Sequence, residues 1–153
     1  MSKQLDTVFF KTISMVTAVP DCALGTEREE SGEMYRYIYN CGGSSISVGK
    51  GISRPVSAVA GMYSASVSGA SGDVCLGFIK HVAIPAGEYG WALKRGLVNV
   101  DAGANASFAA GPSPKSLGAL GLIATAGAGY VIVGETISAV ASGGSCSLFV
   151  DLP

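Results

Sequence analysis

Histidine occurs once in this 153-residue chain, at His81, and charged residues are scarce. Charged residues make up 14% of the chain, against about 25% in a typical soluble domain. A catalytic triad would have to use that single imidazole, and a metal site with several imidazoles is excluded. Carboxylates with EF-hand spacing are also missing, as is a recognisable acid–base pair. The sequence therefore predicts no catalytic residue, no metal and no cofactor.

Clustered basic charge is missing too, because ten Lys and Arg residues are scattered among eleven acids. Binding to nucleic acid needs such a cluster, so that class of partner is not expected. The four cysteines lie far apart without a C-x-x-C pair, which excludes zinc ribbons and redox motifs. We favour free, buried thiols over two disulfides, because no secretion signal is visible in the sequence.

The charges that are present are unevenly placed. Residues 1–54 carry twelve of the 21, and residues 102–153 carry three. The C-terminal third is therefore predicted to form core or a subunit interface. It includes the uncharged run 116–134, which is long enough to span a membrane as a helix. Its glycines each weaken a helix by about 1 kcal/mol, so we expect two buried strands and no membrane association.

What the sequence does contain is the residue pattern of β-strands. MYRYIYN alternates, with Tyr35, Tyr37 and Tyr39 on one face of the expected strand. Further short apolar segments are separated by glycine-rich turns, and this predicts an all-β fold. We expect a compact small β-barrel or sandwich of about eight to ten short strands. Residues 1–24 are expected to form an extended N-terminal arm, and residues 25–153 a single β domain.

Two further segments of the chain allow local predictions of structure. The run Glu27–Glu30 is expected to be a solvated loop. The stretch IPAGEYGWALKRGLVNV, residues 84–100, predicts a hairpin with a turn at residues 85–87 and a strand from Tyr89 onward. His81, just before it, is placed within a strand. The three aligned tyrosines suit a packed sheet face, a protein interface or a carbohydrate-stacking face, and these alternatives stay open.

Three segments in order carry a resemblance to a known class of proteins: GEMYRYIYNCGGSSISVGKGI, GFIKHVAIPAGEYGWALKRGLVNV and GYVIVGETISAVASGGSCSLFVDL. Together they resemble capsid decoration (cement) proteins and related small head proteins of tailed bacteriophages, over about residues 25–152. The resemblance rests on glycine and apolar patterns. It implies a β domain on the outside of the capsid that stabilises contacts between major capsid protein subunits, and it brings no catalytic residues.

The resemblance also implies a homo-oligomer, with a trimer favoured, made in the host cytoplasm and located on the virion surface. Alternatives are another virion component, such as a head fibre base or tail protein, or a glycan-binding β module. The residues predicted to form interfaces are Val8, Phe9, Phe10 and Ile13 in the arm, the three tyrosines Tyr35, Tyr37 and Tyr39, and Trp91, Lys94 and Arg95.

Overall fold

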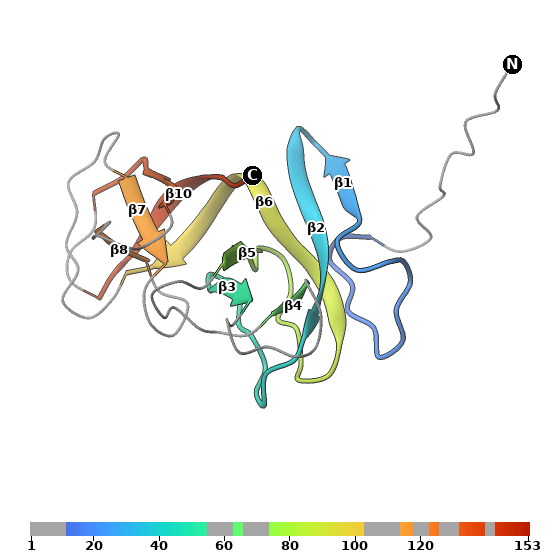
Figure 1. The fold of residues 1–153 in the computed structure, drawn as a ribbon. Helices are drawn as coiled ribbons and strands as arrows, with labels where there is room; N and C mark the ends of the chain where they lie inside the picture. The colour runs from blue at the N-terminus through green and yellow to red at the C-terminus, as the bar shows by residue number, and fades with distance from the viewer. Residues whose placement is uncertain are drawn as a thin grey trace, which may run out of the picture.

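The computed structural model describes residues 12–54, 63–65, 74–102, 114–117, 123–125, 132–139 and 143–153. These residues form ten strands, and no helix occurs among them, so the predicted all-β class is confirmed (Figure 1). The strands are β1 (Glu27–Glu30), β2 (Glu33–Asn40), β3 (Gly51–Arg54), β4 (Ser64–Ala65), β5 (Val74–Phe78), β6 (Tyr89–Asp101), β7 (Pro114–Leu117), β8 (Ile123–Thr125), β9 (Ile132–Thr136) and β10 (Ser145–Asp151).

The ten strands belong to one sheet, with the main order β1-β2-β6-β10-β9-β7-β8. The remaining strands join at its side: β5 pairs with β6 and β3, and β4 pairs with β2. All pairings are antiparallel except that of β2 with β4. The path among the described strands runs open from β1 to β8, so the sheet is not a closed barrel.

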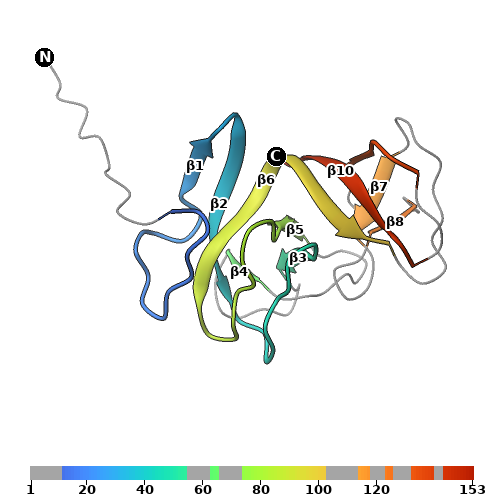
Figure 2. The ribbon, with the colours of Figure 1, turned by 180° about the vertical axis from the view of Figure 1, so that it is seen from behind.

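Strand β6 is the longest element and connects the two halves of the sheet. Its first part, residues 89–95, pairs with β2, and its second part, residues 95–101, pairs with β10. Seen from either side, β6 runs from the half that holds β1 and β2 to the half that holds β7–β10 (Figures 1 and 2). The segment GLVNV, residues 96–100, continues the strand that begins at Tyr89 without a break.

The predicted turn before β6 is confirmed. The N–H of Glu88 donates to the carbonyl of Pro85 over 3.2 Å, and Gly87 has a φ of 78°, which favours glycine. Glu27–Glu30, expected as a loop, is instead the edge strand β1, and that prediction is wrong. The charges suit an edge strand, because exposed charged side chains hinder the addition of further strands.

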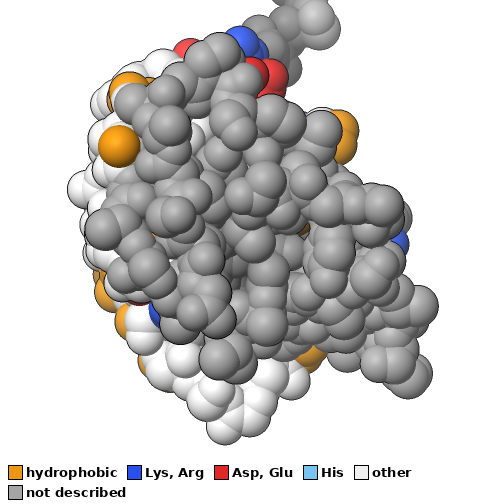
Figure 3. Space-filling model, turned by 90° about the vertical axis from the view of Figure 1, so that its left-hand side faces the viewer, with side chains coloured by type: hydrophobic (Ala, Val, Ile, Leu, Met, Phe, Trp, Pro, Cys, Tyr) orange, Lys and Arg blue, Asp and Glu red, His pale blue; other side chains and the backbone are white. Residues whose placement is uncertain are grey.

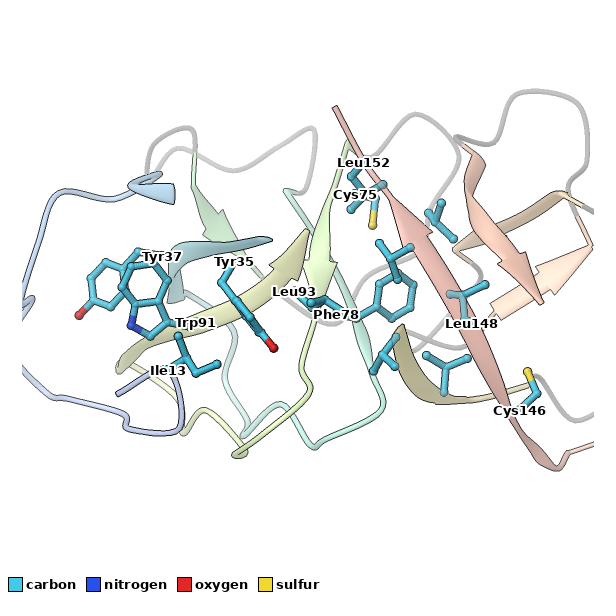
Figure 4. Packing of buried hydrophobic residues seen from close by; sticks show 14 of the residues in the cluster. Ile13, Tyr35, Tyr37, Cys75, Phe78, Trp91, Leu93, Cys146, Leu148 and Leu152 are labelled. Atoms are coloured by element: carbon cyan, nitrogen blue, oxygen red, sulfur yellow. The ribbon is translucent and has the colours of Figure 1, made fainter. Parts of the chain in front are cut away.

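The core consists of two clusters on opposite sides of β2 and β6. The larger one runs from Ile13, near the start of the described chain, through Trp91 and Leu93 to Leu148 on β10 (Figure 4). The smaller one gathers Ile38, Ile46, Ile52, Ala65, Leu76, Ile79, Ile84 and Ala92. Both faces of β2 and of the first part of β6 are therefore covered.

The described part of the expected arm lies against the chain's own sheet. Ile13 is buried beside Trp91, and Thr17 exchanges two backbone hydrogen bonds with Tyr89. The three other arm residues predicted to form an interface, Val8, Phe9 and Phe10, lie outside the described residues.

None of the four cysteines is joined in a disulfide, in line with the thiols that the sequence favoured. Cys75 and Cys146 are buried, and Cys22 and Cys41 are partly buried. Burial raises the pKa of the Cys75 thiol to about 12, so it stays protonated at neutral pH.

Candidate interaction surface

Three of the four described aromatic residues that the sequence offered as surface contacts are in the core. Tyr35 and Tyr37 are each 1% exposed and Trp91 is 7% exposed. The rings of Tyr37 and Trp91 lie 5.0 Å apart, centroid to centroid, and Tyr39 is partly buried beside Tyr89 at 4.9 Å. The aligned tyrosines thus pack within the sheet, and the buried rings offer no face for stacking a sugar.

The basic pair of β6 is split between two environments. Lys94 donates to Oε1 of Glu27 over 2.8 Å, and Arg36 donates to the same oxygen over 3.0 Å. Arg95 is largely exposed, with its Nε 3.6 Å from Oδ1 of Asp151. Of the two, Arg95 is the one whose side chain remains open to a partner.

A β-bulge at Lys94 explains why these neighbours diverge. Tyr35 pairs with Leu93 and Met34 pairs with Arg95, so Lys94 is the extra residue on β6. A bulge shifts the alternation of side chains by one residue. Trp91 and Leu93 face the larger cluster before the bulge, whereas Val98 and Val100 face it afterwards. Arg95, Leu97 and Asn99 therefore point outward.

These outward residues pair with outward residues of β10. Leu97 lies opposite Phe149, and Asn99 lies opposite Ser147, whose hydroxyl donates to Oδ1 of Asn99 over 3.0 Å. Phe149 in turn lies opposite Glu135 on β9, and Ile137 follows two residues later. We call this surface the outer face; its residues are Arg95, Leu97, Asn99, Asp101, Glu135, Ile137, Ser145, Ser147, Phe149 and Asp151.

The outer face has an apolar centre. Leu97 is 47% exposed, Phe149 40% and Ile137 54%, and they are among the few large apolar side chains exposed in the described chain. Charges stand at the ends of the β6–β10 ladder, as Arg95 with Asp151 and as Asp101 with Lys50 at 3.2 Å, and the exposed Glu135 of β9 lies opposite Phe149. Figure 3 views the molecule from the side of β7 and β8, and some apolar side chains of described residues are visible at the margin of this view.

A groove of about 470 Å³ opens on this face. Its lining residues are Val48, Lys80, Leu97, Val98, Asn99, Ile137 and Ser147. Val48 belongs to the loop before β3 and is itself 46% exposed, so it extends the apolar centre beyond the three strands. The only charged group in the lining is Lys80, and its ammonium is held by a carboxylate.

That carboxylate is Glu33, which ties β2 to β6 and to the loop after β5. Both carboxylate oxygens of Glu33 accept hydrogen bonds from the ammonium of Lys80, each over 2.6 Å. The carboxylate also accepts the hydroxyl of Tyr35 over 2.6 Å and the N–H of Leu97 over 3.1 Å. Burial alone would raise the pKa of Glu33, but these donors outweigh it and lower the pKa below 4.5. The groove therefore has a fixed, charge-neutral corner.

His81 lies next to this corner and outside any strand, so its predicted placement is wrong. Its Nε2 is 2.8 Å from the hydroxyl of Tyr35. Since that hydroxyl donates to Glu33, His81 donates to the tyrosine oxygen. The chain's single imidazole thus belongs to a hydrogen-bond network that includes Glu33 and Lys80.

The described residues contain neither a metal-binding cluster nor a membrane-spanning helix. No group of three or more His, Cys, Asp or Glu residues is arranged to hold a metal ion. Among the same residues, no helix is long and apolar enough to cross a membrane.

Asn40 is a buried residue that the sequence analysis did not single out. Its amide donates to the carbonyls of Ser44 and Ile84 over 2.9 and 2.8 Å, and its Oδ1 accepts the N–H of Gly42 over 2.9 Å. The Asn-Cys-Gly-Gly order was a signal of a turn held by the asparagine side chain.

Comparison with known proteins gives a similarity of fold. No protein-family model matches the chain, and no curated protein matches it. Among solved structures, the fold is similar to that of the head fiber gp8.5 N base of bacteriophage phi29, with a TM-score of 0.51 and 11% sequence identity. The match covers 77% of this chain and 95% of that one.

Proposed function

We propose that this protein is a non-enzymatic structural component of a tailed-phage head, located on the capsid surface. The observation that carries the proposal is the similarity of fold to the N base of a phage head fiber protein, which covers 95% of that solved chain. The resemblance of residues 25–152 to decoration and head proteins points the same way. The two lines are separate, because one uses backbone geometry and the other uses glycine and apolar motifs.

In its finer form, the proposal is a decoration protein that binds the major capsid protein and stabilises contacts between its subunits. The surface chemistry supports binding rather than catalysis. Three of the seven exposed large apolar residues of the described chain, Leu97, Ile137 and Phe149, lie together on the outer face, and His81 is engaged with Tyr35. Weak contacts repeated at many sites on a capsid gain strength through effective concentration, so each contact need not be large.

Co-sedimentation tests this form. The purified protein is mixed with expanded capsids of the phage that encodes it, with capsids of an unrelated phage as control. Saturable binding to the cognate capsids alone, together with a raised temperature of capsid disruption, is the expected result. If neither binding nor stabilisation occurs at any protein concentration, the decoration role is wrong.

The head fibre base is the second candidate, and the fold similarity favours it specifically. A fibre base carries a further fibre outward from the capsid, whereas a decoration protein only covers and joins capsomers. Electron cryomicroscopy of virions distinguishes the two by whether density continues outward from this domain. Density inside the head or on the tail would contradict both.

A further inference from the structure

We propose that the groove on the outer face receives an uncharged, apolar segment of the major capsid protein, which presents backbone carbonyls to it. This inference rests on the proposed decoration function and adds the chemistry of the contact. The groove measures about 470 Å³, within the range of about 300–1,000 Å³ that is typical of binding sites for small groups. It therefore suits a few residues of a partner rather than a whole domain.

The walls of the groove are held in place by the rest of the fold. Val48 stands on a loop in which the N–H of Gly49 donates to the carbonyl of Ile79 over 2.8 Å. On the side of β9, the N–H of Ile137 donates to the carbonyl of Ser147 over 2.9 Å. A site that is already formed binds at a smaller cost in conformational freedom. The groove therefore needs no rearrangement of these walls before a segment enters.

The charges at the groove disfavour a strongly charged occupant. Lys80 is the one charged residue in the lining, and both oxygens of Glu33 hold its ammonium over 2.6 Å. The pair is neutral as a whole, so an acidic or a basic segment finds no free counter-charge and would lose its own hydration on entry. An uncharged segment covers Val48, Leu97 and Ile137 without that cost.

The polar groups of the lining offer donors rather than acceptors. Oδ1 of Asn99 already accepts the hydroxyl of Ser147, whereas Nδ2 of Asn99 has no hydrogen-bond partner among the described residues. The ammonium of Lys80 carries three N–H groups and makes two bonds to Glu33, which leaves one for a further acceptor. Backbone carbonyls of a partner can accept from both groups without bringing a charge. Such carbonyls need a donor when they are buried in an interface.

The test measures the apparent affinity of the full chain for expanded capsids of its phage by co-sedimentation. Leu97→Lys and Leu97→Glu place charges of opposite sign in the groove, at a side chain that is 47% exposed. Val74→Lys and Val74→Glu are the matched controls, because Val74 is 43% exposed on β5 and does not line the groove. Circular dichroism checks the fold of each variant. If a Leu97 variant does not fold, the same two changes at Ile137, which is 54% exposed, take its place.

Both groove variants are expected to weaken binding by roughly tenfold or more, because either charge would be buried without a partner. The Val74 variants are expected to stay within about twofold of the natural protein, as for most surface changes. The affinity of the natural protein is expected to vary by less than about threefold between roughly 50 and 500 mM salt, because salt screens charged contacts.

Several results would overturn the proposal. Tighter binding by Leu97→Lys would identify an acidic occupant, and tighter binding by Leu97→Glu a basic one. An equal loss in the Val74 variants would show that the effect is not specific to the groove. If the natural protein and all variants bind alike, the decoration function stands and the groove assignment is wrong. If the natural protein itself does not bind, the decoration function is wrong and this inference falls with it.

Discussion

Asn40 shows how one buried amide can hold a corner of the fold. It lies at the end of β2, is fully buried, and makes three hydrogen bonds to backbone groups of residues 42, 44 and 84. The turn after β2 and the turn before β6 are thereby fixed to each other. A buried polar group of this kind contributes mainly because its partners would otherwise be left unpaired.

Asn40→Ala is therefore expected to lower the free energy of unfolding by about 2 kcal/mol, because the carbonyl of Ser44 and the N–H of Gly42 lose this partner, whereas the carbonyl of Ile84 keeps its bond from the N–H of Ile46. Asn40→Asp is expected to cost at least as much, since a carboxylate cannot donate to the two carbonyls. Chemical denaturation at low protein concentration measures both. Asn99→Ala, at an exposed position with one side-chain bond, serves as control and is expected to cost about 0.5 kcal/mol. Equal losses at the two asparagines would contradict this account.

At the scale of elements, Glu33 connects three segments that are distant in sequence. It begins β2 and receives bonds from Lys80 after β5 and from Leu97 of β6. The N–H of Leu97 follows the bulge of β6 and finds its acceptor in this side chain. The carboxylate thus helps to hold β6 at the point where its side chains change faces.

This connection predicts a dependence of stability on pH. The pKa of Glu33 is lowered in the folded protein, so the ionised form stabilises the fold. Its contribution is complete above the ordinary value of 4.5 and is lost as the pH falls through the lower, folded-state pKa. Glu27 and Asp101 also have lowered pKa values, through hydrogen bonds from Lys94 and from Ser145, and their contributions have the same sign.

Thermal unfolding between pH 7 and pH 3 measures the effect. We expect the Tm to fall below about pH 4.5, the ordinary glutamate range. Glu33→Gln is expected to lower the Tm at pH 7 and to flatten the fall at acid pH. Glu29→Gln removes an exposed carboxylate of β1 and should leave the profile close to that of the natural protein. An unchanged acid profile in Glu33→Gln would show that other carboxylates are responsible.

The same elements show what the sequence could and could not predict. Strict alternation over Tyr35–Tyr39 and the Pro-Ala-Gly turn predicted β2 and the start of β6, because both signals are local. Nothing in the sequence around Lys94 indicates a bulge, because the bulge arises from the pairing of β6 with β2 and β10. The direction of Leu97, which points outward, depends on that bulge. Glu27–Glu30 was misjudged because it pairs with β2 as a strand, and Glu27 there finds partners in Arg36 of β2 and in the distant Lys94 of β6.

The candidate surface was predictable only in outline. The scarcity of charge in residues 102–153 suggested an interface or core there, and Phe149 of β10 and Ile137, just after β9, do belong to the outer face. The aromatic residues chosen as contacts were conspicuous in the sequence, but large rings stabilise a fold most when they are buried. Tyr35, Tyr37 and Trp91 accordingly occupy the core.

At the scale of the whole molecule, the larger core cluster extends through both halves of the sheet. It joins Ile13 and Trp91 in the half with β2 to Cys146 and Leu148 on β10 (Figure 4). A single cluster of this kind has no internal boundary at which one half could lose its packing alone. The halves should therefore unfold together.

Two internal probes can check this in urea, one in each half. Fluorescence reports on Trp91, the only tryptophan, and thiol labelling with identification by mass spectrometry reports on Cys146. We expect both transitions to have the same midpoint, because both side chains lie in one cluster. The partly buried Cys41 is the control and should react at a lower urea concentration. Labelling of Cys146 well before the fluorescence changes would reveal an independent half.

The continuity of β6 has one more consequence, for how the molecule carries force. Its backbone is shared by the ladder with β2 and the ladder with β10. A pull that draws the two halves apart would be transmitted along covalent bonds of this strand. The flanking ladders would then be loaded in shear, with several hydrogen bonds sharing the tension, instead of being peeled apart one pair at a time. The fold is thus built to transmit tension from one end of β6 to the other without a weak joint between its halves.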